Sequence, residues 1–456
     1  MKLKLLRIAI LLALLILAAC NSRAENDIKT STENYAMHEG DETAIETADA
    51  QVDDFGVHTQ SPGKIAIITT ESEASALNNS LSESWLMQLI EKYGADRIAI
   101  YTWPRRYANS PIDETVEMIN EIANNHDIGV LVINPAFHGT DHIIAILNEQ
   151  RDDIFVIYLD YQITSDYVDS NSPFRANTLA DAAYNANLII DFDTLAAVAI
   201  FPQKALELGA DTLVYFYDTS SLWDWGASDE DFNESVARAA AEYEQSHQFN
   251  ILREKSKEAG LKFISIDIAG AIQCGSSYHT FMIETVPPLI EEHGTDIVLF
   301  GLDNERVFWD WRTHGFIYIP PRPGSWFELT PKHFAWELPV GGYHDLSAEE
   351  RGNINTIQLV EEIRTELEKR DLLGRMAAPP MSTHLLFPLA AAEYGIRWTN
   401  DEVEREGIDI YVLEQIMAEI IQEHTGLQHG ATARPLYEDS IIHENFILVL
   451  PDYLVY

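Results

Sequence analysis

Basic residues are scarce in this chain of 456 residues. It has 30 lysines and arginines against 73 aspartates and glutamates, a formal net charge of −43 at pH 7. A surface this acidic repels phosphate backbones, which excludes nucleic acid as a partner. It also repels anionic lipid headgroups, so any hold on a membrane must come from elsewhere.

Lysine is the scarcer of the two basic residues, with 11 lysines against 19 arginines. Arginine keeps its charge at high pH, whereas lysine loses it. An excess of acid combined with a shortage of lysine is typical of proteins surrounded by saline or alkaline medium. This composition therefore favours an extracellular setting.

Long hydrophobic runs are missing after residue 20, so no membrane span is predicted there. The single apolar run, Leu5–Ala19, follows a basic start and is shorter than the roughly 20 residues that a span needs. We therefore predict a secretory signal peptide over residues 1–19.

The end of this run, Leu17-Ala18-Ala19-Cys20, resembles the lipobox of bacterial lipoproteins. That resemblance implies that Cys20 is acylated and becomes the first residue of a protein anchored outside the cytoplasm, on the cell membrane or on an outer membrane. The alternative is an ordinary signal peptide followed by an incidental cysteine.

Cysteine is almost absent. Only Cys274 remains beside Cys20, so a chain with a lipid on Cys20 has no internal disulfide. We interpret Cys274 as a buried thiol. A hydrophobic core must hold the fold, and 46% hydrophobic residues supply one large domain or two lobes.

Hydrophobic periodicity is also absent from residue 21 to about residue 61, where Glu, Asp, Thr, Ser and Ala dominate. We predict that residues 20–61 form a lipid-anchored, disordered acidic linker that ends at Ser61-Pro62-Gly63. A flexible chain of this length spans roughly 35 Å, enough to lift a domain off the lipid surface.

From Lys64 onward, short apolar runs alternate with helical stretches, which predicts parallel sheets covered on both faces. The expected strands are Ile65–Thr69, Arg97–Thr102, Gly129–Ile133, Ile154–Leu159, Leu188–Phe192, Thr212–Tyr217, Phe263–Ile268, Ile297–Gly301 and Phe316–Ile319. The expected helices lie near Leu81–Tyr93, Ile112–Asn124, Asp141–Gln150, Leu195–Leu208, Glu230–Ala259 (one long helix), Thr280–His293 and Glu305–Thr313.

Two successive series of strands and helices predict an α/β fold with two doubly wound lobes. The C-terminal third adds helices near Thr356–Lys369 and Val412–His424, an apolar stretch near Leu385–Tyr394 and a strand at Ile441–Leu450. We expect it to pack on the first lobe. The first lobe is then 62–192 plus about 323–456, and the second lobe is 193–322.

Two strands of this pattern carry a resemblance to the type I periplasmic-binding-protein fold. Ile154–Asp160 is similar to the strand ending in Asp that closes the first lobe's sheet in that superfamily. Ile297–Asp303, ending in Gly-Leu-Asp, is similar to the second-lobe strand whose Gly-x-Asp contacts the ligand. The resemblance implies two lobes that bind a small polar solute, and it covers residues 64–320 best.

Among such proteins, the nearest groups are an uncharacterised lipoprotein family of this fold and, more distantly, the basic-membrane-protein lipoproteins, which bind nucleosides. Those nucleoside binders carry an Asp-Lys-Ser-Phe-Asn-like signature after the first strand. This chain has Ala76-Leu77-Asn78-Asn79-Ser80 there, without the Asp and the Phe. A sugar, a nucleoside or a similar solute all remain open.

Ligands of open α/β sheets bind beyond the carboxyl ends of the strands, so the loops that follow the strands contain the candidate ligand-binding residues. They are Asn78, Asn79, Trp103, Arg105, Phe137, Asp160, Asp218, Trp223, Ser276, Asp303 and Asn304. Carboxylates and amides accept hydrogen bonds from sugar hydroxyls, and aromatic faces stack on rings. The alternatives are that the aspartates form helix caps or turns and that the tryptophans pack between loops.

Metal and catalytic patterns are missing. The histidines of residues 279–344 match no metal-ligand spacing, and no strand is followed by a nucleophile elbow, a P-loop or a dinucleotide-binding glycine pattern. We therefore predict no metal, no cofactor and no enzymatic activity.

The predicted function is a surface-tethered solute-binding protein that closes on a small polar ligand and delivers it to a membrane partner such as an ABC-type permease. One rival is an enzyme that uses the same cleft. Another is a sensor or scaffold lipoprotein with a protein partner, for which the long acidic helix predicted near residues 230–259 would be the docking element.

Overall fold

The structure is a computed structural model. It describes residues 63–70, 85–104, 112–137, 139–161, 179–219, 229–269, 278–301, 315–319, 331, 334–335, 338, 340, 355–438 and 440–456. Cys20, the linker 20–61, Cys274 and the helix expected near 305–313 lie outside these residues.

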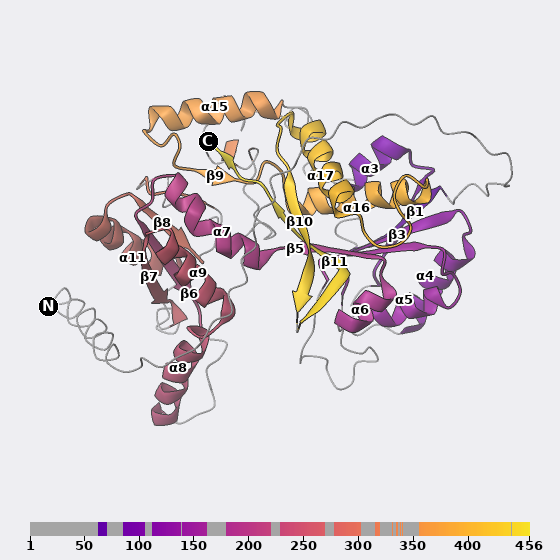
Figure 1. The fold of residues 1–456 in the computed structure, drawn as a ribbon, viewed down its shortest axis with the longest axis horizontal. Helices are drawn as coiled ribbons and strands as arrows, with labels where there is room; N and C mark the ends of the chain where they lie inside the picture. The colour runs from indigo at the N-terminus through magenta and orange to yellow at the C-terminus, as the bar shows by residue number, and fades with distance from the viewer. Residues whose placement is uncertain are drawn as a thin grey trace. The chain divides into compact units, whose positions relative to one another are not determined.

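The larger of two sheets, which we call the large sheet, contains seven strands in the order β2-β1-β3-β4-β5-β11-β10 (Figure 1). All neighbouring strands are parallel except the terminal pair β10 and β11, which is antiparallel. The strands are β1 (Lys64–Thr69), β2 (Ile98–Thr102), β3 (Ile128–Asn134), β4 (Phe155–Leu159), β5 (Leu188–Phe192), β10 (Ala431–Glu438) and β11 (Ile441–Pro451).

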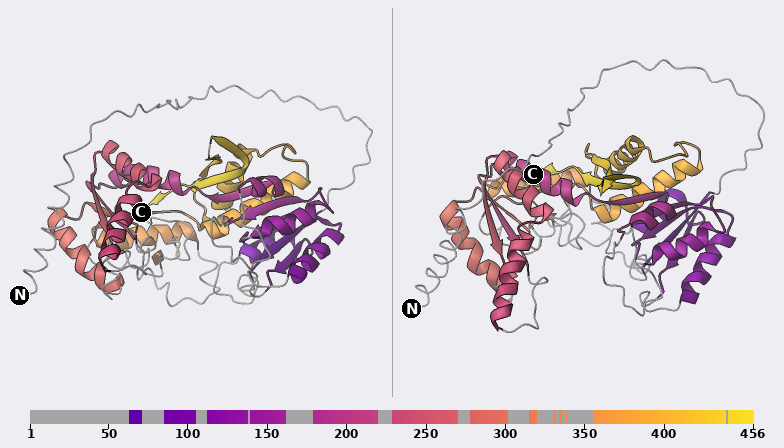
Figure 2. Two further views of the ribbon diagram at one scale, coloured as in Figure 1. Left: turned by 90° about the horizontal axis from the view of Figure 1, so that it is seen from below. Right: turned by 60° about the horizontal axis from the view of Figure 1, so that its bottom comes forward.

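Helices cover both faces of the large sheet because its strands are apolar on both sides. Ile65 and Ile67 of β1 pack into one core, whereas Ala66 and Ile68 pack into the core on the opposite face. The first core includes α3 (Trp85–Tyr93), α16 (Thr383–Thr399) and α17 (Ile410–Thr425). The opposite core includes α4 (Ile112–Asn124), α5 (Thr140–Asn148) and α6 (Leu179–Asn185). Figure 2 shows α16 and α17, in orange to yellow, on one face and α4 and α5, in purple, on the other.

Helix α16 lies very close to the large sheet, and a glycine permits this. A Cβ atom on Gly395 would lie 2.6 Å from Cγ1 of Val130 on β3 and 3.4 Å from Cδ1 of Ile157 on β4. Real Cβ contacts are almost never as short as 2.6 Å, so any larger residue would push the helix away from the sheet. The apolar stretch predicted near Leu385–Tyr394 is therefore a helix whose packing depends on this position.

The smaller sheet, which we call the small sheet, is parallel with the order β7-β6-β8. Its strands are β6 (Thr212–Tyr217), β7 (Lys262–Asp267) and β8 (Ile297–Phe300). Parallel bridges join Val298 to Ile317 and Tyr318 to Met376, and β9 (Ala377–Ala378) pairs with β12 (Leu454–Val455). The strand predicted at Phe316–Ile319 is thus present only as two bridges.

Helices α7 (Thr194–Glu207) and α9 (His247–Glu258) pack on one face of the small sheet, and α15 (Thr356–Lys369) packs on the other. Leu359 and Ile363 of α15 belong to the same core as Leu299 of β8. The packing therefore divides the C-terminal third between the two sheets, whereas the sequence analysis assigned all of it to the first lobe. The lobe boundaries themselves stay a prediction.

The long helix predicted over Glu230–Ala259 is wrong. The structure has two helices there, α8 (Asp229–Tyr243) and α9, separated by a turn at residues 244–246. Ser246 begins α9 as its N-cap, with its hydroxyl accepting a hydrogen bond from the backbone N–H of Phe249. The remaining described helix, α11 (Tyr278–His293), agrees with its prediction.

Candidate functional site

Four of the eleven predicted ligand-binding residues lie in the described part of the chain: Trp103, Phe137, Asp160 and Asp218. The other seven, Asn78, Asn79, Arg105, Trp223, Ser276, Asp303 and Asn304, lie outside it. Trp103, Phe137 and Asp160 follow β2, β3 and β4 respectively. Because these strands are parallel, all three residues lie at the carboxyl edge of the large sheet.

The aromatic pair Trp103 and Phe137 comes from two of these loops. Their ring centroids are 6.0 Å apart at an interplanar angle of 55°. The indole N–H of Trp103 donates to the backbone oxygen of Pro135 at 3.1 Å, and the ring is only 5% exposed. Trp103 thus packs in the core, and the half-buried Phe137 is the more accessible ring.

Asp160 is exposed and has a left-handed backbone with φ of 48°. Residues other than glycine seldom adopt this conformation, and when they do they are often found at functional sites. Its position at the end of the apolar strand Ile154–Leu159 placed Asp160 on the candidate list. The structure adds that its carboxylate is open to solvent at the edge where ligands of such sheets bind.

Asp191 of β5 is a neighbouring acid that the sequence analysis missed. Burial raises its pKa to about 6, the N–H of Phe192 lowers it, and the charge of Asp160 raises it further. The Phe192 N–H donates to Oδ1 of Asp191 at 2.7 Å. A single polar residue inside the run Leu188–Phe192 was the signal that would have found it.

Asp193, two residues further on, joins three parts of the fold. Its carboxylate caps α7 by accepting from the N–H of Ala196 at 2.8 Å. The same carboxylate accepts two hydrogen bonds from the guanidinium of Arg434 on β10. Its backbone N–H donates to the oxygen of Val449 on β11 at 2.9 Å. Asp193 therefore fixes the crossover from β5 into α7, and its charge is already satisfied.

Asp141, in the first turn of α5, is a second missed acid. It is 7% exposed, and its Oδ2 accepts a hydrogen bond from the hydroxyl of Tyr161 at 2.6 Å. Its other oxygen, Oδ1, is buried and has no hydrogen-bond partner within the described part of the chain. Burial raises the pKa of Asp141 to about 6, although the hydroxyl of Tyr161 opposes this shift. The residues next to Asp141 in the sequence do not indicate that its side chain is buried.

The carboxyl edge of the small sheet carries the fourth candidate. Asp218 follows β6 and is exposed. Beside it, the hydroxyl of Thr219 donates to Oδ2 of Asp267 at 2.6 Å, and Oδ1 of Asp267 accepts from the N–H of Ala269 at 2.9 Å. Thr219 and Asp267 were not among the predicted residues.

Gly301, which follows β8, approaches the end of β6 very closely. It has φ of 90°, and a Cβ there would lie 2.0 Å from the backbone oxygen of Phe216. Only glycine fits this position. Gly301 is the glycine of the predicted Gly-x-Asp motif. Its close packing against β6 is sufficient to explain why a glycine occurs at this position.

No group of three or more metal-binding side chains occurs among the described residues. A cavity lies elsewhere, at the amino edge of the small sheet. None of the described helices has the length and apolar character of a membrane span.

Comparison with known proteins supplies a family and a fold. A family model described as "Protein of unknown function (DUF3798)" matches residues 64–319. No curated protein matches the sequence. A proposed transcriptional regulator from Clostridium difficile 630 is similar in structure, with a TM-score of 0.61 and 14% identity over 87% of this chain and 99% of that chain. At this identity the likeness shows the fold alone.

Two other solved structures are more distant. A sugar ABC transporter from Actinomyces odontolyticus ATCC 17982 has a TM-score of 0.39 and 12% identity, covering 78% of this chain and 88% of its own. An ABC transporter solute-binding protein from Burkholderia graminis C4D1M, in complex with D-arabinose, has a TM-score of 0.29 and 11% identity, covering 76% and 93%. The predicted α/β fold class with parallel sheets is confirmed.

Proposed function

This chain belongs to the DUF3798 family, and we propose that it is a membrane-tethered, extracytoplasmic solute-binding protein whose lobes close on a small polar ligand. The observation that carries the proposal is the carboxyl edge of the large sheet. Exposed Asp160 in its left-handed conformation, half-buried Asp191 and the ring of Phe137 lie at this edge on or directly after three neighbouring strands.

These groups suit a neutral solute rich in hydroxyl or amide N–H groups. Carboxylate oxygens accept hydrogen bonds from such donors, and an aromatic ring covers an apolar face of a sugar or a base. Asp218 would face the ligand from the carboxyl edge of the small sheet. The ligand therefore donates hydrogen bonds to carboxylates of both sheets and is enclosed by a hinge motion at the crossovers.

A panel of sugars, nucleosides, amino acids and short-chain acids tests this proposal by thermal shift. A ligand that binds only the folded state raises the melting temperature by mass action. We expect one class of polar solute to do so, and a chain that responds to no member of the panel contradicts the proposal.

A pair of variants locates the binding. Asp160→Asn keeps the left-handed backbone accessible while removing the charge, because asparagine tolerates that conformation. We expect it to abolish most of the ligand-induced shift. Asp152→Asn is the matched control, since Asp152 is exposed at the other end of the same strand, before β4. An equal loss in both variants would count against a site at the carboxyl edge.

The tether and the transport partner are the further parts of the proposal. A lipid on Cys20 would hold the protein to the membrane, and a permease would take up the released solute. Cys20→Ala should move the protein from the membrane fraction to the soluble extracytoplasmic fraction, measured by fractionation and intact-mass spectrometry. Unchanged membrane retention and an unchanged mass would show that Cys20 carries no lipid.

A further inference from the structure

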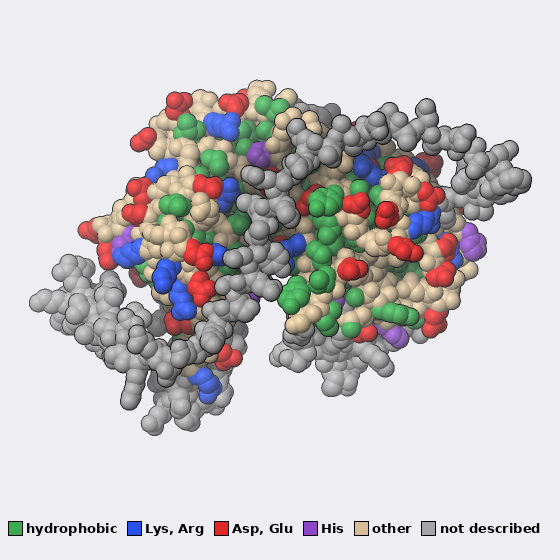
Figure 3. All heavy atoms as spheres, viewed as in Figure 1, with side chains coloured by type: hydrophobic (Ala, Val, Ile, Leu, Met, Phe, Trp, Pro, Cys, Tyr) green, Lys and Arg blue, Asp and Glu red, His purple; other side chains and the backbone are tan. Residues whose placement is uncertain are grey.

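A cluster of basic residues interrupts the acidic composition of the chain on the small-sheet side. Arg253, Lys255 and Lys257 lie on α9, and Lys262 begins β7. Four of the chain's 30 basic residues thus fall within ten positions of a molecule whose net charge is −43. Figure 3 shows blue Lys and Arg side chains gathered over α9 and β7.

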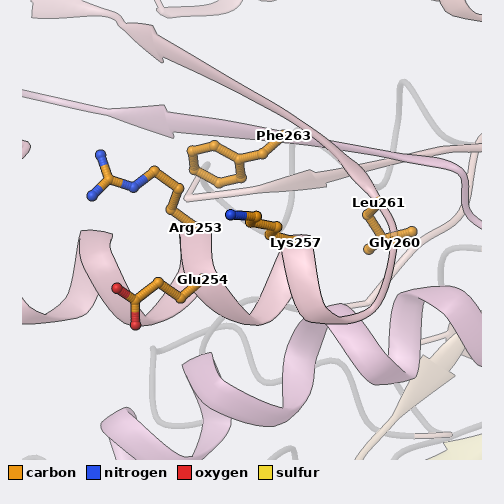
Figure 4. Close-up of a pocket in the computed structure, with 6 residues that line it drawn as sticks. All are labelled: Arg253, Glu254, Lys257, Gly260, Leu261 and Phe263. Carbon is orange, nitrogen blue, oxygen red and sulfur yellow. The ribbon is translucent and has the colours of Figure 1, made fainter. Parts of the chain in front are cut away.

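A cavity of about 660 Å³, open to solvent and lined mostly by exposed residues, lies within this cluster. It is lined by Arg253, Glu254, Lys257, Gly260, Leu261 and Phe263. In Figure 4, Arg253 and Lys257 extend from α9 on the side that faces the ring of Phe263, and Glu254 points away from that ring. The volume falls in the range of sites for small organic ligands, roughly 300–1,000 Å³.

The two cations that line the cavity differ from the third cation on the same helix. Lys255 forms an ion pair with Glu258 at 2.7 Å. Arg253 and Lys257 form no ion pair with any residue that the structure describes. Among the described residues, their positive charges are therefore available to an incoming anion.

The guanidinium of Arg253 has two contacts with residues of its own helix. Its guanidinium carbon lies 5.7 Å from the centroid of Phe249, and one guanidinium nitrogen donates to Oδ1 of Asn250 at 2.6 Å. Phe249 packs edge-on against Phe263, with centroids 5.7 Å apart at 90°. A guanidinium carries five N–H donors, and the hydrogen bond to Asn250 uses only one of them. The other donors of Arg253 are therefore held in position beside the ring of Phe263.

The position of the cavity separates it from the proposed solute site. Gly260 and Leu261 precede β7, and Phe263 is its second residue, so the cavity lies at the amino edge of the small sheet. The proposed solute site lies at the carboxyl edges. Binding here is therefore an additional property and does not depend on the proposed function.

We propose that this cavity binds a small organic anion that carries a carboxylate on a flat apolar ring. The carboxylate is held by Arg253 and Lys257, and the ring packs against Phe263 and Leu261. The negative charge of the whole molecule does not prevent this. At about 0.15 M salt the Debye length is near 8 Å, so charges inside the cavity outweigh those on the distant surface.

Benzoate is the probe, added to the full-length chain at about 0.15 M NaCl and followed by saturation-transfer difference NMR, which suits weak ligands of a protein this size. Benzyl alcohol is the uncharged comparison. We expect benzoate to bind with saturation and benzyl alcohol to bind more weakly. Arg253→Gln should raise the Kd of benzoate about ten-fold, the loss of one charge-assisted contact, and Lys257→Gln should act in the same direction.

Matched variants make the outcome decisive. Lys255→Gln removes the same charge from the same helix but does not line the cavity, so it should leave the Kd unchanged. Phe263→Leu should lower the saturation of the ring protons, and Asp160→Asn should have no effect. If Lys255→Gln raises the Kd of benzoate as much as Arg253→Gln does, benzoate is attracted by the general positive charge of this helix end and not held in the cavity. That result, or a lack of saturation with benzoate, would overturn the proposal.

Discussion

Arg151 and Asp141 are both buried ionisable side chains on the α4–α5 side of the large sheet, and their surroundings differ. Arg151 donates from Nε and a terminal nitrogen to Asp153, and to the backbone oxygens of Ala123 and Ile128. Oδ2 of Asp141 has one hydroxyl donor, and Oδ1 has no partner among the residues that the structure describes. Burial of Arg151 is therefore compensated, whereas burial of ionised Asp141 is not.

The first prediction concerns Asp141 and pH. Because the pKa of Asp141 is raised to about 6 in the folded chain, the native state binds a proton that the unfolded state, with a pKa near 3.8, does not. Ionised Asp141 thus lowers the stability above pH 6, and stability returns as the pH falls from about 6 towards 3.8. The groups around it are Tyr158, Tyr161, Asp181 and Asn185.

Asp141→Asn removes this proton dependence. We expect the variant to be more stable than the parent by roughly 2 kcal/mol at pH 8, with the difference shrinking at pH 4.5. Urea denaturation at both pH values measures it. Asp152→Asn, at an exposed site, is the control. A difference between variant and parent that is the same at both pH values would contradict the argument.

The second prediction concerns Arg151. Its side chain is 8% exposed, and its planar fork serves a carboxylate and carbonyls at once. Lysine carries a single point charge and cannot reach all of these acceptors, so Arg151→Lys should lower the free energy of unfolding by about 2 kcal/mol. Arg370→Lys, at a surface pair with Glu366, should change it by about 0.5 kcal/mol or less. Equal effects of the two substitutions would refute the distinction.

At the scale of helices and strands, the pair Asp193–Arg434 connects elements that are far apart in the chain. Asp193 caps α7 and its side chain is 3% exposed, while Arg434 comes from the edge strand β10. Removing Arg434 leaves a buried carboxylate unpaired, which is costly. We therefore expect this one ion pair to stabilise both β10 and the first turn of α7.

The third prediction tests this dependence. Arg434→Gln should destabilise the fold by roughly 2–4 kcal/mol and speed hydrogen exchange both in the first turn of α7 and along β10. Asp193→Asn combined with Arg434→Gln should recover part of the loss, since the uncompensated charge is gone. Faster exchange confined to β10 would mean that the pair does not support α7.

Most strands and helices could be predicted from local pattern, because buried parallel strands are continuous apolar runs of four to seven residues. The strands β5 and β6 and the helices α4 and α15 match their predicted bounds. The break between α8 and α9 was missed because its cause is partly tertiary. Tyr243, at the end of α8, stacks on Tyr217 of β6 with centroids 4.8 Å apart. No local pattern contains that contact.

The candidate site could be predicted only in part. Strand ends located Asp160 and Asp218, because the carboxyl ends of parallel strands share one edge. Asp141, Asp191 and Asp193 were missed because burial and pairing set their properties. The partner of Asp193 lies 241 residues away in the chain, which no spacing rule detects. The same limit applies to Trp103, whose loop position gave no sign of its burial.

At the scale of the whole molecule, charge dominates the composition. With a net charge of −43, the acidic side chains repel one another more strongly in the compact folded state than in the expanded unfolded chain. Many of the described ion pairs, such as those of Lys204 and Arg364, are exposed and contribute little in return. The fold should therefore be least stable where the charges are least screened.

The fourth prediction is that added salt stabilises this protein. The Debye length falls from about 30 Å at 0.01 M to about 3 Å at 1 M, so repulsion between distant acids disappears over that range. We expect the melting temperature to rise steeply up to about 0.3 M NaCl and to level off beyond it, where only close pairs still interact. Sucrose at matched osmolality is the control, because it stabilises by exclusion from the surface without screening charge. If sucrose raises the melting temperature as much as NaCl does, or if NaCl lowers it, repulsion among the 73 acidic residues does not limit the fold, and the composition loses its link to a saline setting.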